Sequence, residues 1–131
     1  MKKFNIKEVR THMGLFDFAI VTVVGEYDQA AKYCAWKFES PDYEQFAIDS
    51  NLGYIPRGKT FFRTGYVPVI WIPDVPKTAR EHATFSHECL HAVMHMLEWA
   101  AVPISADTEE VLCHSMAHVI NNTLEKLEKM K

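Results

Sequence analysis

The sequence predicts a single α+β domain over residues 1–131, because strand patterns lie mainly in its first half and helix patterns in its second. The chain is 48% hydrophobic and 24% charged, which is typical of a folded globular protein and not of a disordered one. A chain of this length can bury its own core without disulfide bonds. We find no internal repeat and no Gly/Ser linker that would divide it.

The first predicted strand is the β-branched run at residues 18–24, which stops at a glycine. A helix is expected over 27–38, where apolar residues recur at helical spacing. Residues 39–58 are rich in turn-forming residues and predict a long loop that contains a short helix. Two more strands are expected at 60–63 and 67–72, joined by a short turn.

Pro68 lies within the 67–72 run, so this strand is expected either to lie at a sheet edge or to begin after the proline. A long helix is expected from Pro76 to about Trp99, with Asp74 as its N-cap. After a proline-containing break, a second helix is expected to begin near the acidic residues at 107–110 and to run to the lysine-containing end of the chain. The predicted order is therefore strands first and a helical hairpin last.

The charge balance and the apolar runs limit the classes of partner. With 14 Lys and Arg against 17 Asp and Glu, the net charge is −3, so no nucleic-acid partner is expected. The polar N-terminus and the short apolar runs predict neither a signal peptide nor a membrane span, so we expect a cytoplasmic protein. Three widely spaced cysteines do not predict a secreted disulfide framework. The sequence carries no signature of an oligomeric state.

Six of the seven histidines fall between His82 and His118, and two of them form an HExxH motif, His87-Glu88-Cys89-Leu90-His91. On a helix His87 and His91 are one turn apart on one face, so both imidazoles can reach one metal ion. Zinc suits two imidazoles and a carboxylate, with a water at the fourth position. Glu88 is then the expected general base that takes a proton from the metal-activated water.

A third ligand must come from outside the motif. The metzincin extension would require Gly and His where the chain has Met94 and Leu97, so that class is excluded. The remaining candidates are side chains near the start of the second helix: Asp107, Glu109, Glu110, His114 and His118.

The segment Glu110-Val111-Leu112-Cys113-His114 resembles the ExxxD segment of the gluzincins, the thermolysin-like zinc peptidases, whose glutamate is the third zinc ligand. It is still more similar to small phage-encoded metallopeptidase-like proteins, in which a second helix after HExxH carries a Glu-x-x-small-Tyr pattern. The resemblance covers about residues 58–127, and His114 departs from the Asp or Tyr of those families. It implies a small zincin-like domain: a few-stranded sheet, an edge strand packed on the HExxH helix, and a C-terminal helix that bears the ligand Glu110.

Helical periodicity indicates a different carboxylate. Glu109 falls nearer than Glu110 to the centre of the apolar stripe that contains Leu112 and Met116, and a buried carboxylate is usually paired or bound to metal. The resemblance favours Glu110, which we take as the predicted ligand with Glu109 as the alternative. His95 and His118 are expected to be polar positions near the site.

These observations predict a zinc-dependent peptidase that binds Zn²⁺ through His87, His91 and Glu110 and cleaves a peptide or protein substrate. If the phage resemblance holds, it acts in a bacterial host cytoplasm. The strand at 67–72 is expected to be a core strand, to offer its edge to the peptide, or to do both. The alternatives are a non-catalytic, zinc-stabilised binding or regulatory domain, and a histidine-rich helical hairpin with no native metal. Cys89 and Cys113 are expected to be buried thiols between helices.

Overall fold

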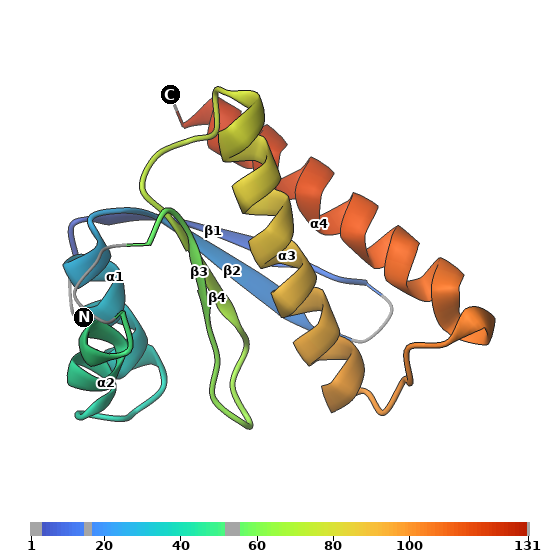
Figure 1. Ribbon diagram of the computed structural model, residues 1–131, viewed down its shortest axis with the longest axis horizontal. Coiled ribbons are helices and arrows are strands. Elements are labelled where there is room, and N and C mark those ends of the chain that lie inside the picture. The colour runs from blue at the N-terminus through green and yellow to red at the C-terminus, as the bar shows by residue number, and fades with distance from the viewer. Residues whose placement is uncertain (1–3, 15–16, 52–55, 131) are drawn as a thin grey trace.

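The computed structural model describes residues 4–14, 17–51 and 56–130, and its fold is α+β, as predicted (Figure 1). The elements in chain order are β1 (Ile6–His12), β2 (Ala19–Gly25), α1 (Tyr27–Lys37), α2 (Tyr43–Asp49), β3 (Lys59–Phe61), β4 (Val69–Ile72), α3 (Ala79–Trp99), a 3-10 turn (Ala106–Thr108) and α4 (Glu109–Lys129). Positions 52–55 of the predicted loop, and Lys131 at the predicted lysine-containing end, lie outside the described residues.

The four strands form one mixed sheet in the order β1-β2-β4-β3. β1 is antiparallel to β2, and β3 is antiparallel to β4 with Thr60 opposite Ile70. β2 and β4 are parallel, with Val21 opposite Val69. Parallel neighbours require a crossover connection, and α1 and α2 lie within it. β3 also lies within this connection, and it forms one edge of the sheet.

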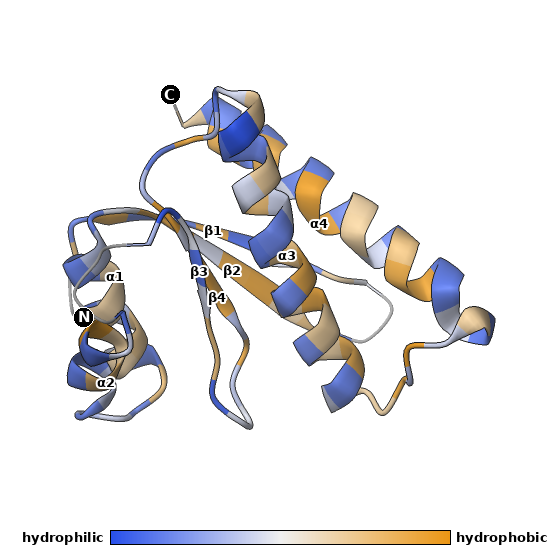
Figure 2. Ribbon diagram, in the orientation of Figure 1, coloured by the Kyte–Doolittle hydropathy of each residue, from blue (hydrophilic) through white to orange (hydrophobic). Residues whose placement is uncertain are grey.

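Helices cover both faces of the sheet, α1 and α2 on one side and α3 and α4 on the other (Figure 1). Successive side chains of β2 alternate between the two cores: Ile20 packs with α3 and α4, and Val21 packs with α1 and α2. Ile70 and Trp71 of β4 divide in the same way. Because both faces are buried, β2 and β4 are nearly continuous apolar runs, visible as orange strands in Figure 2.

The predicted element order lacks β1, which lies at the sheet edge opposite β3. The fully buried side chains of β1, Val9 and Thr11, lie on one face, whereas Lys7, Glu8 and Arg10 are exposed. This half-buried alternation is the usual pattern of an edge strand. Because three of its seven residues are charged, β1 lacks the apolar pattern that would predict a strand.

The strand around Pro68 begins after the proline, at Val69, which is one of the two predicted alternatives. The other alternative is wrong, because β4 lies between β2 and β3 and is not an edge strand. Pro68 contributes only its carbonyl, which accepts a hydrogen bond from the N–H of Val21 at 3.2 Å. The missing N–H of the proline therefore removes no hydrogen bond from this pairing. The strand edge near the predicted site therefore belongs to β3.

The start of α3 also differs from the prediction, which placed it at Pro76 with Asp74 as the cap. The helix begins at Ala79, and Thr78 is its N-cap. The Thr78 hydroxyl accepts the N–H of Glu81 at 3.1 Å, and the Glu81 carboxylate accepts the N–H of Thr78 at 3.1 Å. This reciprocal capping box satisfies two N–H groups that have no partner within the helix.

α4 is attached to β1 by polar contacts as well as by its apolar stripe. The hydroxyls of Thr11 and Thr123 are both buried and lie 2.8 Å apart. Nearer the N-terminal end of α4, His118 Nε2 donates to the main-chain oxygen of His12 at 2.7 Å. None of the helices in the described part of the chain is long and apolar enough to cross a membrane.

Candidate metal centre on α3

The two motif histidines lie on the exposed face of α3, and their rings converge. His87 Nε2 and His91 Nε2 are 3.2 Å apart, with ring centroids 4.9 Å apart at an interplanar angle of 76°. This geometry follows from their spacing, since residues four apart on a helix lie one above the other. The opposite face of α3, which contains Phe85, Cys89 and Ala92, is buried in the core.

This separation fits one bound zinc ion. Two imidazole nitrogens at about 2.0–2.1 Å from a tetrahedral ion lie about 3.3 Å from each other. The 3.2 Å between the nitrogens of His87 and His91 matches that value without any movement of α3. The donor set, two imidazoles, is also of the kind that zinc prefers.

Glu88 lies beside the pair but is buried, with 8% of the residue exposed. Thr60 Oγ1, on β3, lies 2.9 Å from both Glu88 Oε1 and the Glu88 main-chain oxygen, so one hydroxyl hydrogen serves two acceptors. The second carboxylate oxygen, Oε2, is 4.0 Å from His87 Nε2. Thr60 thus donates to Oε1 of Glu88, while Oε2 lies on the side of His87.

Gly58, at the start of the segment that leads into β3, explains how this strand approaches α3 so closely. A Cβ at this position would lie 2.8 Å from the Thr84 methyl group and 3.3 Å from Glu88 Cγ. The first distance is shorter than real Cβ contacts allow, so any larger residue must displace side chains of α3. The sequence gives no hint of this contact, because Gly58 and Glu88 are thirty residues apart.

β3 is fixed on its other face by Lys59. Its ammonium group donates to Ser50 Oγ at 2.6 Å, to Asn51 Oδ1 at 3.1 Å and to the Tyr27 hydroxyl at 3.2 Å. Burial lowers the pKa of Lys59, and the negative charge of Glu88 across the strand opposes that shift. One edge of β3 pairs with β4, and in the described sheet no strand pairs with its other edge.

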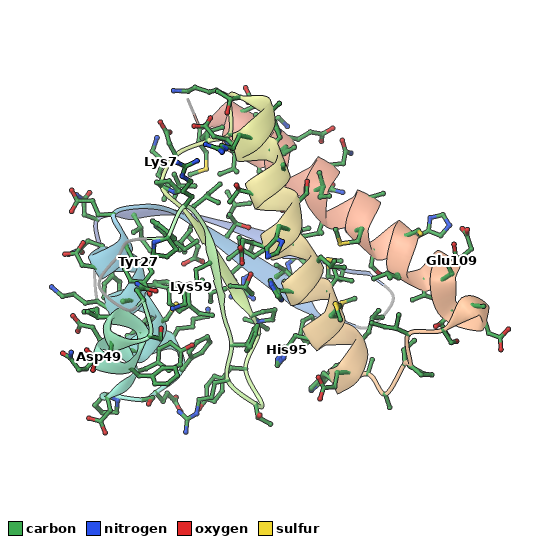
Figure 3. All side chains as sticks on the ribbon, viewed as in Figure 1. Lys7, Tyr27, Asp49, Lys59, His95 and Glu109 are labelled. Atoms are coloured by element: carbon green, nitrogen blue, oxygen red, sulfur yellow. The ribbon has the colours of Figure 1, made fainter. Side chains whose placement is uncertain are left out.

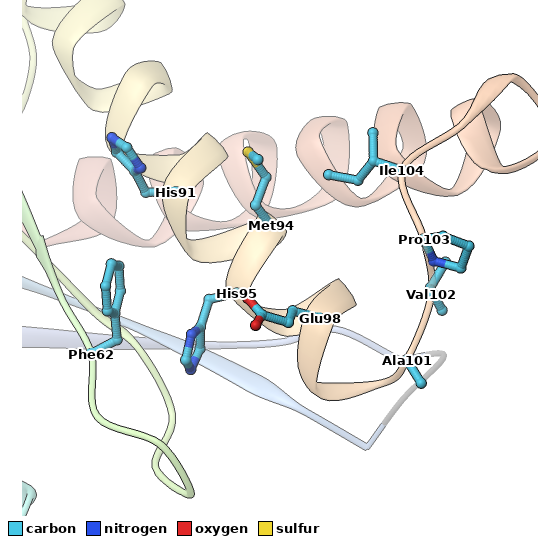
Figure 4. Close-up of a pocket in the computed structure, with 9 residues that line it drawn as sticks. All are labelled: Phe62, His91, Met94, His95, Glu98, Ala101, Val102, Pro103 and Ile104. Carbon is cyan, nitrogen blue, oxygen red and sulfur yellow. The ribbon is translucent and has the colours of Figure 1, made fainter.

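A cleft of about 600 Å³ lies on the exposed face of α3 next to His91 (Figure 4). Three segments line it: α3, the loop that follows α3, and Phe62 in the β3–β4 hairpin. The His95 ring stacks on Phe62, with centroids 5.1 Å apart and an interplanar angle of 9°. His95 is therefore a half-buried wall residue that joins the helix to the hairpin.

Glu110, the predicted third ligand, lies on the exposed side of α4, where its carboxylate is 3.2 Å from His114 Nε2. Glu109, the alternative, is also exposed, in the first turn of the same helix (Figure 3). Within the described ranges, no three His, Cys, Asp or Glu side chains are grouped so as to hold a metal. The structure thus brings together His87, Glu88 and His91 but not Glu110, whose role as a ligand stays a prediction.

The cysteines take no part in this centre. All three are free, and Cys89 is buried as predicted, where burial raises the pKa of its thiol. Cys113 is exposed, so the prediction of a buried thiol at that position is wrong. Its place on α4 lies outside the stripe of Ser115, Val119 and Thr123 that packs inward.

No family model matches the chain, and neither a similar curated protein nor a similar solved structure was found. The fold and the site define an α+β domain with a histidine pair and a buried carboxylate on one helix.

Proposed function

We propose that this chain is a zinc-dependent peptidase of zincin-like fold, with His87 and His91 as metal ligands and Glu88 as general base. The observation that carries the proposal is the convergence of the two Nε2 atoms to 3.2 Å beside a buried, oriented carboxylate. A histidine-rich surface without function would not require a glutamate between the two ligands to be buried and hydrogen-bonded to a neighbouring strand.

His87 and His91 would hold the ion, and Glu110 is proposed as third ligand because of the resemblance of its segment to the gluzincin pattern. When bound, zinc supplies a Lewis acid that polarises the substrate carbonyl and makes a water molecule acidic near neutral pH. Both histidines are exposed, so the ion would be accessible to substrate.

Glu88 is suited to accept the proton of the attacking water and to return it to the nitrogen of the leaving amine. Its Oε1 accepts a hydrogen bond from Thr60 at 2.9 Å, and its Oε2 lies 4.0 Å from His87 Nε2. Only 11% of the side chain is exposed, so little solvent competes for that oxygen. A base must be held within hydrogen-bonding reach of the proton that it removes, and the Thr60 contact provides that restraint.

The unpaired edge of β3 supports a peptide as substrate. An extended segment added to β3 would form main-chain hydrogen bonds and would lie alongside α3, near His91. Because Thr60 of β3 contacts Glu88 directly, the added segment would lie next to the catalytic base. A cytoplasmic setting is proposed with this activity, in agreement with the three free cysteines.

Metal analysis of tag-free protein, followed by peptide cleavage, tests the proposal. We expect about one zinc per chain, loss of zinc in His87→Ala, and no loss in the control His82→Ala, which changes an exposed histidine of the same helix outside the motif. Glu88→Gln should retain zinc and lose hydrolysis, whereas the surface control Glu125→Gln should retain both. Zinc-dependent melting without cleavage of any peptide in a broad library would instead identify a non-catalytic zinc-stabilised domain. Protein without zinc would refute both.

A further inference from the structure

The cleft beside His91 contains one carboxylate, that of Glu98. Figure 4 shows His91, Met94, His95 and Glu98 along α3, with Phe62 facing them from the β3–β4 hairpin. Glu98 follows His91 by seven residues, which is roughly 10 Å along the helix axis. It therefore lies within reach of a peptide bound at the metal site.

Among the described residues, no hydrogen bond or ion pair engages the carboxylate of Glu98, which is exposed. Arg63 is a candidate cation, because it lines a second hollow together with Glu98 on the hairpin side. Arg63 is committed elsewhere: its guanidinium donates to the main-chain oxygen of Phe38 and lies 5.2 Å from the centre of the Tyr66 ring. The negative charge of Glu98 is thus available to a ligand.

Two aromatic side chains stand on the surface beside this carboxylate. Phe62 and Trp99 are 44% and 57% exposed. Each has one ring contact that holds it in place, Phe62 with His95 and Trp99 with Phe18 at 5.1 Å. Fixed, exposed aromatic faces next to a free carboxylate form a surface that attracts cations.

The remaining walls are apolar. Met94 and Ile104 are 43% and 52% exposed, and Val102 and Pro103 complete the loop side of the cleft. A ligand group that suits both features has an aliphatic stem to cover the apolar walls and a cationic head to meet Glu98. The side chains of arginine and lysine have this chemistry. An acidic side chain would be repelled, and a purely apolar one would bury the carboxylate without a partner.

We propose that this cleft is a specificity subsite for a basic residue, so that the enzyme cleaves peptides that carry Arg or Lys within about three residues of the scissile bond. The distance follows from the rise of roughly 10 Å between His91 and Glu98 and about 3.3 Å per residue of extended peptide. This inference rests on the proposed peptidase function for its meaning, but the cleft itself can be tested without catalysis.

Cleavage of a randomised peptide library, with the products identified by mass spectrometry, gives the first test. Wild-type protein should cut with Arg and Lys enriched at one position near the cleaved bond. In Glu98→Gln that enrichment should fall by about 2-fold to 5-fold, the loss expected for one ion pair on an exposed surface. The control Glu125→Gln should keep the wild-type preference. Cleavage without basic enrichment, or enrichment that survives Glu98→Gln, overturns the subsite and leaves the peptidase proposal intact.

A binding measurement separates the two proposals if no peptide is cut. The probes are acetyl-Gly-Gly-Arg-Gly-Gly-amide and its citrulline analogue, which has nearly the same shape but no charge, and calorimetry gives both Kd values. We expect the arginine peptide to bind about 2-fold to 5-fold more tightly, and Glu98→Gln to abolish the difference. Because Glu98 is exposed, an unchanged melting temperature is expected for the variant. Equal Kd values for the two peptides on wild-type protein overturn the proposal.

Discussion

Thr60→Val removes the hydroxyl that β3 donates to Glu88, the proposed general base, while it keeps the shape and the β-branched character of the residue. The hydroxyl of Thr60 lies 2.9 Å from Glu88 Oε1 and 2.9 Å from the Glu88 main-chain oxygen. A hydrogen bond to a charged group contributes about 1.5–3 kcal/mol, and removing its donor leaves the acceptor buried and unpaired. Glu88 is only 8% exposed, so water cannot fully replace the hydroxyl.

We therefore expect Thr60→Val to lower the free energy of unfolding by about 1.5–3 kcal/mol, or the melting temperature by roughly 5–15 °C for a domain of this size. Urea unfolding with EDTA present measures the effect without any contribution from bound metal. Thr60→Ser is the matched control, because it keeps the hydroxyl and loses only one methyl group, at a cost of about 1 kcal/mol or less. If the valine and serine variants unfold at the same urea concentration, the hydroxyl does not stabilise Glu88 and the proposed restraint on the base is wrong.

Three further predictions concern the packing around α3 and α4. Gly58→Ala should lower kcat, because a Cβ would lie 2.8 Å from the Thr84 methyl group and 3.3 Å from Glu88 Cγ, so side chains of α3 must move; equal kcat values for the two proteins would contradict this. Thr11→Val and Thr123→Val should each cost about 1–3 kcal/mol in urea unfolding, since each leaves a buried hydroxyl unpaired, and the double variant should cost less than the sum of the two. Hydrogen bonds from two backbone N–H groups lower the pKa of Glu81 below 4.5 in the folded state. The ionised carboxylate therefore adds to the free energy of unfolding above the unfolded pKa, and this stabilisation is lost as the pH falls through the folded pKa. Melting temperatures between pH 6 and pH 3 should accordingly fall less steeply for Glu81→Gln than for wild type, and parallel curves would count against the capping box.

Local sequence patterns were sufficient for most of the fold. The apolar run of β2, the helical spacing in α1 and the two long C-terminal helices each depend on residues within a few positions of one another. β1 was not predicted, because this edge strand has few buried apolar side chains and its sequence therefore shows no apolar run. The edge position wrongly expected for β4 depended on strand order, which neither composition nor periodicity contains.

For the site, the sequence by itself determined the His87–His91 pair. Residues four apart on any α-helix share a face, so the 3.2 Å convergence of their nitrogens needs only that α3 forms. The tertiary structure alone decided that Glu88 is buried beside β3, that Thr60 donates a hydrogen bond to it, and that Glu98 lines the cleft beside His91. It also places Glu110 on the exposed side of α4, with His114 as its partner. Helical geometry fixes contacts over one turn, whereas contacts between elements depend on how the sheet and helices pack, and that packing is set by the whole chain.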